Sequence, residues 1–261
     1  MSREFRELPN LSNVVAGSKA SLLVPLGYTY DVIKLEYAGV TLAQIQDIEV
    51  RIGSKPFQKF KDGDQLNDIN KYYGRNVEAG VLTFWFIRPE FDNVDTRRMT
   101  AIGTADIRSF DIQFKINEGA DAPVISAYAV RSNNTPLGMI TKIKDFPTSS
   151  ATSGVQEIDN FPRQGRIAAI HSFKADITKT EVMVNSNPFN EFGKTIASGL
   201  QKDHKRVPND AKHTTVDFTL EGDWKQSLIV EGATDLRIRN TLATSGATEI
   251  VVEYLSGIAG M

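Results

Sequence analysis

Residues 49–60 read E-V-R-I-G-S-K-P-F-Q-K-F, and residues 181–192 read E-V-M-V-N-S-N-P-F-N-E-F. Six of the twelve positions are identical, and the stretches begin 132 residues apart in a chain of 261. Each stretch ends a strand-like segment and precedes a helix-like one. Gly53 in one copy stands where Asn185 stands in the other, and both residue types tolerate the left-handed backbone of a tight turn. We interpret the repeat as a duplicated strand-turn-strand corner, one in each of two domains.

Segments in which apolar and polar residues alternate fill most of both halves of the chain. Residues 47–53 and 110–116 are apolar at every second position, which predicts strands with one buried face. Residues 81–87, V-L-T-F-W-F-I, are nearly all apolar and predict a strand covered on both faces. The other predicted strands are 21–26, 30–37, 124–130, 166–173, 180–184, 216–220, 228–230, 235–239 and 249–255.

One helix is predicted at the same place in each half, directly after the duplicated corner. In residues 61–73 the apolar side chains recur at helical spacing, and in residues 190–202 Phe192, Ile196 and Leu200 stand four apart. Many short strands with little helix indicate sandwiches or barrels, and eight strands in two facing sheets form a jelly roll. The sequence therefore predicts an all-β tandem double jelly roll: two eight-stranded β-sandwiches, each with a short inserted helix.

The predicted domain organisation follows from this pattern. Residues 1–18 are polar and predict an N-terminal arm, which we expect to depend mainly on neighbouring chains for its order. An N-terminal jelly roll at 19–146 and a C-terminal jelly roll at 161–261 are predicted on either side of a linker at 147–160. The linker contains P-T-S-S-A-T-S-G, a composition typical of flexible connections.

Composition narrows the function. Hydrophobic content of 41%, charged content of 24% and a net charge of −2 are those of an ordinary globular protein, without the basic excess of a general nucleic-acid binder. The chain has no cysteine, which excludes disulfides and thiolate zinc sites. The charged start differs from a signal peptide, and no apolar run approaches the ~20 residues that span a bilayer, so we expect folding in a cytoplasm.

No pattern predicts a catalytic or metal centre. His171 lies on a predicted strand and is expected to be an outward polar residue, while His204 and His213 are expected in a solvated loop. The sequence contains no nucleotide-binding glycine loop, H-E-x-x-H or G-x-S-x-G motif. We therefore predict no catalytic, cofactor-binding or metal-ligating residues.

Two acidic stretches allow a calcium hypothesis beside a structural one. Asp62, Asp64 and Asp68 resemble part of a calcium loop without its full spacing, and the favoured interpretation is a helix N-cap with acidic residues in the first turn. A second oxygen-rich loop contains Glu90, Asp92, Asn93 and Asp95.

The aromatic run Phe84-Trp85-Phe86 has two interpretations. It is compatible with a sugar-stacking platform, but such a run is more typical of a core or a subunit interface. We favour the second.

Several segments together resemble the major capsid proteins of the corticoviruses. They occur in the same order from near the N-terminus to near the C-terminus: N-V-V-A-G (13–17), P-L-G-Y-T-Y-D-V-I-K-L-E-Y-A-G-V-T (25–41), F-I-R-P-E (86–90), R-I-A-A-I-H (166–171), V-D-F-T-L-E-G-D (216–223), D-L-R-I (235–238) and E-I-V-V-E-Y (249–254). The family comprises tailless icosahedral bacteriophages with double-stranded DNA and an internal membrane. The resemblance is looser at 92–98 and between 130 and 155.

The resemblance implies a structural major capsid protein, a tandem double jelly roll whose pseudo-hexagonal homotrimers tile an icosahedral shell around an internal membrane. Its expected partners are further copies of itself and virion proteins at the vertices and in the membrane, with no specific nucleic acid. Its expected location is the virion, assembled in the cytoplasm of a bacterial host. The family also makes calcium at subunit interfaces plausible, although no ligands are assigned.

Two rival classes remain. A jelly-roll receptor- or carbohydrate-binding viral spike would gather exposed aromatic residues and carboxylates in one loop cluster, whereas the aromatic residues here lie mostly inside strand patterns. A cupin-type enzyme would need several histidines on facing strands, and three scattered histidines do not supply them. We therefore predict no enzymatic activity.

Overall fold

The structure, a computed structural model, describes residues 3–259. They form two compact units. Residues up to Lys71, Arg75–Ile143 and the segment from Gly257 onward make up the first unit, and Tyr72–Gly74 together with Lys144–Ser256 make up the second. Among these residues no helix is both long and apolar enough to cross a membrane.

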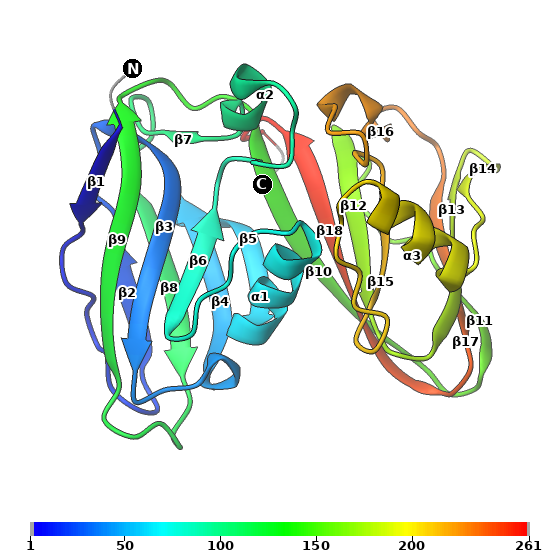
Figure 1. Cartoon of the computed structure of the whole chain (residues 1–261), viewed down its shortest axis with the longest axis horizontal. Helices are drawn as coiled ribbons and strands as arrows, with labels where there is room; N and C mark the ends of the chain where they lie inside the picture. Colours follow the sequence, from blue (N-terminus) through cyan, green and yellow to red (C-terminus); the bar gives the residue numbers. More distant parts are fainter. Residues whose placement is uncertain (1–2, 260–261) are drawn as a thin grey trace. The chain divides into compact units, whose positions relative to one another are not determined.

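Strands predominate in both units (Figure 1). The elements of the first unit are β1 Glu4–Glu7, β2 Lys19–Leu23, β3 Tyr28–Ala38, a 3₁₀ turn at Leu42–Gln44, β4 Ile45–Ile52, β5 Lys55–Asp62, α1 Gly63–Tyr72, β6 Val81–Trp85, α2 Val94–Arg98, β7 Ile102–Gly103, β8 Phe110–Ile116 and β9 Val124–Asn133, and it shares β10 Ile140–Ser150 with the second unit. The remaining elements are β11 Gly154–Ile158, β12 Arg166–Phe173, β13 Ile177–Val184, β14 Asn187–Asn190, α3 Lys194–Asp203, β15 Thr214–Asp217, a 3₁₀ turn at Trp224–Gln226, β16 Leu228–Ile229, β17 Leu236–Leu242 and β18 Gly246–Ser256.

The first unit is a sandwich of two sheets. One has the order β1-β9-β3-β6 with β7 beside β3, and in the other β10, β5, β4, β8 and β2 are neighbours in that order. Buried aromatic residues join the two sheets: Tyr30 of β3 packs on Phe110 of β8 with ring centroids 5.7 Å apart, and Phe86 packs on the same ring at 5.5 Å. Period-two alternation explains this core, because every second residue of β8 points inward.

The second unit repeats this plan. Strand β12 lies between β15 and β18 with β16 also beside it, and the facing sheet has the order β11-β17-β13-β14. Its core contains buried apolar residues from both sheets, including Ile170 of β12, Val182 of β13, Ile238 of β17 and Val252 of β18. The two predicted sandwiches are therefore present, each with a helix directly after the duplicated corner. Helix α2, only five residues long, lacks a recognisable apolar period and was not predicted.

The duplicated corner is a β-hairpin of the same construction in both units. Strands β4 and β5 pair with Arg51 opposite Pro56, and β13 and β14 pair with Met183 opposite Pro188. The register shifts at equivalent places, between Val50 and Arg51 in the first hairpin and between Val182 and Met183 in the second. The two prolines therefore occupy the same structural position, as the repeat predicts.

The two-residue turns of these hairpins share one backbone conformation. Gly53 and Ser54 have φ of 57° and 69°, and Asn185 and Ser186 have 49° and 66°. Two successive left-handed residues form a type I′ turn, whose twist matches that of the flanking strands. Both turns are also held alike by the neighbouring loop, because the Gly53 amide donates to the Ser109 carbonyl (3.1 Å) and the Asn185 amide to the Asp235 carbonyl (3.0 Å).

The two hairpins differ in the burial of the residues after the proline. Phe57 and Phe60 of β5 are 1% and 3% exposed, whereas Phe189 and Phe192 are 56% and 50% exposed. The repeat predicts that Phe57 and Phe189 occupy equivalent positions and are both buried, and this prediction is wrong for Phe189. The cause is strand position: β5 is eight residues long and pairs with β10 on its far side, whereas the four-residue β14 is the edge of its sheet.

The N-terminal arm is tied to its own unit. Strand β1 pairs antiparallel with β9 over four residues, and the Arg3 side chain lies 3.1 Å from the buried carboxylate of Asp31. Leu8, which follows β1, is 5% exposed. The expectation that this arm depends mainly on neighbouring chains for its order is wrong for these residues, because β9 offers an unpaired edge that β1 completes.

Strands occupy most of the range expected to be a flexible linker, 147–160. Strand β10 extends to Ser150, and β11 begins at Gly154 and pairs with β17 over five residues. The division between the units falls inside β10, between Ile143 and Lys144. Hydrogen bonds between neighbouring strands determine the structure here, and the composition of the segment does not predict them.

Substitution of the equivalent phenylalanines tests the difference between the two hairpins. Phe57→Ala should lower the free energy of unfolding of the first unit by ~3–5 kcal/mol, because a large buried ring is replaced by a cavity. Phe189→Ala, the matched control, should change it by about 0.5 kcal/mol or less in the dissociated chain. Urea denaturation of both variants measures the two values, and equal losses would contradict the assignment.

Candidate functional site

Two of the histidines are buried, which the sequence did not predict. His171 lies on the outer face of β12, as predicted, but is 0% exposed because that face is covered, and His213 is 1% exposed, so the solvated-loop interpretation is wrong for His213. Only His204, directly after α3, is partly exposed. The outer face of β12 is covered by Tyr72 and Tyr73, which belong to the same unit but precede β12 by a long stretch of sequence.

A hydrogen-bonded cluster surrounds His171. Its Nδ1 lies 2.9 Å from Thr215 Oγ1 on β15, and its Nε2 lies 2.9 Å from Glu253 Oε1 on β18. Thr215 Oγ1 also lies 3.3 Å from His213 Nδ1, and Gln201 donates to the Thr215 carbonyl at 2.6 Å. The cluster thus links the sheet of β12, β15 and β18 to helix α3.

A second group of polar side chains lies beside it in the same unit. Arg206 Nε donates to Asp217 Oδ2 at 2.8 Å, and the Tyr72 hydroxyl donates to the same oxygen at 3.3 Å. The Arg206 guanidinium also stacks on Tyr73, 5.5 Å from the ring centroid. Burial raises the pKa of Tyr72 well above its ordinary value, and the Asp217 carboxylate acts in the same direction.

These groups are closed to solvent and therefore to a substrate. His171, Glu253 and Asp217 have side chains at most 2% exposed. Buried polar groups that satisfy one another hold a fold in one arrangement, and removing one member leaves its partners unpaired. The burial of these groups supports a structural role for them.

The acidic positions also have structural partners. Asp62 accepts a hydrogen bond from the Gln65 amide at 2.9 Å, which confirms the predicted helix N-cap at α1. Asp68 is buried and Asp64 is exposed, so these three aspartates do not form one ligand set.

Glu90 is paired with two arginines. Its Oε1 lies 2.9 Å from Arg75 Nη2 and 3.0 Å from Arg88 Nε. Burial alone would raise the pKa of Glu90, but the two guanidinium groups outweigh it and lower the pKa below its ordinary value. Asp92 and Asp95 from the same predicted loop are exposed, and Asn93 caps α2 through the Asp95 amide (2.9 Å). Over residues 3–259 no three acidic or histidine side chains gather in a way that would hold a metal ion.

The aromatic run belongs to the core, in agreement with the favoured interpretation. Phe84 and Phe86 are each 1% exposed and Trp85 is half-buried. No sugar-stacking platform is formed by these three side chains.

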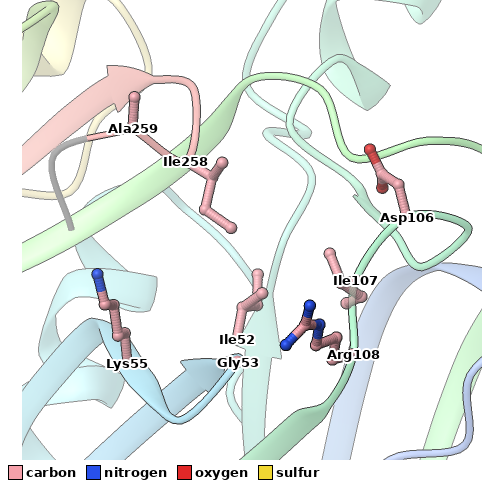
Figure 2. Close-up of a pocket in the computed structure, with 8 residues that line it drawn as sticks. All are labelled: Ile52, Gly53, Lys55, Asp106, Ile107, Arg108, Ile258 and Ala259. Atoms are coloured by element: carbon pink, nitrogen blue, oxygen red, sulfur yellow. The ribbon is translucent and has the colours of Figure 1, made fainter.

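One surface pocket of about 380 Å³ lies beside the first duplicated hairpin (Figure 2). Its lining consists of Ile52, Gly53, Lys55, Asp106, Ile107, Arg108, Ile258 and Ala259. Figure 2 shows these side chains coming from the hairpin, from the segment before β8 and from the end of the chain. The lining carries two cations, one carboxylate and no hydroxyl or imidazole, so it has no nucleophile-and-base pair.

A feature that the sequence did not predict is an exposed apolar surface on β14, on α3 and on the short segment between them. We call it the α3 surface; its members are Phe189, Phe192, Ile196 and Leu200, which are 56%, 50%, 63% and 38% exposed. Phe192, Ile196 and Leu200 stand four residues apart in the sequence, which indicates an apolar helix face. Spacing alone does not show whether another part of the protein covers that face. Contiguous exposed apolar side chains are typical of protein interfaces.

The buried side chain of His213 makes the stability of the second unit depend on pH. Burial lowers the pKa of His213 from 6.5 to about 3, and His171, Lys212 and Lys194 act in the same direction. The unfolded chain therefore binds one more proton than the folded chain between about pH 6.5 and pH 3. Stability should be full above pH 6.5 and fall with decreasing pH through this window, by up to about 1.4 kcal/mol per pH unit from this group.

Denaturation of His213→Gln from pH 7 to pH 4 measures this contribution. The variant should show a shallower loss of stability with falling pH than the unsubstituted chain, while His204→Gln, at a partly exposed position, serves as control. Identical slopes for His213→Gln and the unsubstituted chain would contradict the assignment.

Comparisons with known proteins agree with the geometry. Residues 5–132 match the model of the viral coat protein P2 N-terminal domain, and residues 140–258 match that of its C-terminal domain. The chain is 33% identical to the major capsid protein P2 of Pseudoalteromonas phage PM2, over 97% of each chain.

Solved structures extend this likeness. The crystal structure of the major capsid protein P2 from bacteriophage PM2 matches with a TM-score of 0.95 at 32% identity, over 99% of each chain. The crystal structure of the STIV MCP matches with a TM-score of 0.73 at 11% identity over the whole of both chains, a likeness of fold alone. The predicted double jelly roll is thereby confirmed. With both of its units matched and a relative of this identity over nearly its whole length, the chain belongs to the P2 family of viral coat proteins.

Proposed function

We propose that this chain is a structural major capsid protein that associates with copies of itself into pseudo-hexagonal homotrimers, which tile an icosahedral shell around an internal membrane. The observation that carries the proposal is the match of both units to capsid proteins, with 33% identity to the PM2 protein over nearly the whole chain. The duplicated hairpin adds physical support. Three chains with two similar units each present six similar units, a number that packs hexagonally.

The polar clusters and the pocket agree with a structural role for the protein. The polar clusters of the second unit are buried, and the surface pocket of the first has no catalytic pair. We therefore propose no enzymatic activity. The alternative of a receptor- or carbohydrate-binding spike is not supported, because the relatives are shell proteins and the aromatic run Phe84-Trp85-Phe86 lies in the core.

Partners and location follow from the same family. We propose that the protein resides in the virion, that it is assembled in the cytoplasm of a bacterial host, and that it meets vertex and membrane proteins there. We also propose that calcium ions bind between copies, and we assign no ligand residues to them. The exposed carboxylates of Asp92 and Asp95 are accessible to another copy.

The mass of the purified protein in solution tests the proposal. Light scattering should give three times the 28.9 kDa mass of the chain at micromolar concentration. A single-chain mass at every concentration, both with calcium and with a chelator, would contradict the homotrimer.

A further inference from the structure

The α3 surface has an equivalent in the first unit that is covered. Phe57 and Phe60 occupy the positions of Phe189 and Phe192 in the repeat, and they are buried. In α1, the helix equivalent to α3, Leu66 and Ile69 are 4% and 2% exposed, whereas α3 leaves its apolar side chains in solvent. The apolar side chains of the hairpin and its helix are therefore covered in the first unit and exposed in the second. What covers the α3 surface can be inferred from the repeat itself.

The second unit shows what the end of such a helix packs against. Tyr72, the last residue of α1, and Tyr73, which follows it, belong to the second unit and lie on the outer face of its sheet of β12, β15 and β18. Their rings lie 5.4 Å and 6.2 Å from the His171 ring. His171 in turn is hydrogen-bonded to Thr215, the neighbouring residue on β15.

The first unit contains the equivalent outer face. Strands β3 and β6 of the first unit are equivalent to β12 and β15 of the second. Lys34 of β3 lies opposite Thr83 of β6, as His171 of β12 lies opposite Thr215 of β15. Lys34 Nζ donates a hydrogen bond to Thr83 Oγ1 at 3.4 Å. Around Lys34, however, the face is open to solvent: Tyr128 and Val124 of β9 are 38% and 62% exposed. We call this the β3–β9 face.

Charge favours contact between the two surfaces. Glu36 on β3 and Glu7 on β1 are exposed on the β3–β9 face, where Glu7 pairs directly with Tyr128. Lys202 in α3 and Lys205 just after it are exposed at the end of α3 that is equivalent to the tyrosine pair. The basic end of the α3 surface thus matches the acidic border of a face that exposes Tyr128 and Val124.

We infer that the α3 surface of one copy docks on the β3–β9 face of a second copy of this chain. The inference rests on the proposed self-association and specifies its contact. Because two different surfaces meet, the contact is heterologous, and each chain carries both halves of it.

Thiol cross-linking tests the contact directly, since the chain has no cysteine. Asp203, equivalent to Tyr72, and Lys34, equivalent to His171, are the positions to substitute. Co-assembled copies that carry either Asp203→Cys or Lys34→Cys should be joined in pairs by a short thiol cross-linker, and a chain with both substitutions should form covalent trimers. Asp203→Cys with Val155→Cys, a 65% exposed position on β11, is the matched control and should give no trimer.

Surface variants provide a second readout. Ile196→Asp should reduce the mass from three chains to one without changing the melting temperature of the dissociated chain, because Ile196 is 63% exposed. Lys202→Glu should weaken association, and Glu36→Lys in the same chain should restore part of it. Val155→Asp should leave the trimer intact.

The outcomes separate the two claims. If the unsubstituted chain is a single chain under all conditions, both the homotrimer and this contact fail. If it is trimeric but Ile196→Asp is trimeric too, and Asp203 and Lys34 do not cross-link, the contact is wrong while the homotrimer stands.

Discussion

Two successive left-handed residues fix the hairpin on which each unit depends. Gly53-Ser54 and Asn185-Ser186 form the same type I′ turn, and this turn sets the register of the strand pair that it joins. A slip of one residue would move every inward side chain of β4 or β13 to the outer face. The shared bulge then places each proline opposite the same partner position, and a helix comes next in both units. A local backbone constraint thus underlies both cores.

The repeated hairpin also explains why the two units differ where they do. In the first unit the strand after the turn is long, pairs on both sides and buries its phenylalanines. In the second it is a short edge strand, and Phe189 with the apolar residues of α3 remains exposed. Fully burying a large apolar side chain stabilises by about 1.5–3 kcal/mol, so four exposed apolar side chains represent a substantial driving force for association. A protein whose function is to join copies of itself has a use for such a surface.

Much of the architecture could be predicted from the residues, because strands with one buried face carry a period of two and the corner is repeated almost unchanged. The rest depends on contacts between distant parts of the chain. The period placed His171 on an outer face correctly, but it could not show that Tyr72 and Tyr73 cover that face. The spacing of Ile196 and Leu200 identified a helix face without showing whether the chain covers it. The composition of 147–160 suggested a linker, whereas pairing of β11 with β17 makes part of it a strand. A chemical site could not be predicted, and the polar clusters found are internal.

The central claim is that the duplicated corner is completed within the chain in the first unit and by another copy in the second. Amide hydrogen exchange, compared between the dissociated chain and the assembled protein, tests this most directly. The account predicts that amides of residues 187–203 gain protection on assembly, while those of residues 55–72 are already protected in the single chain. Unchanged exchange at 187–203 in a fully assembled sample would contradict it.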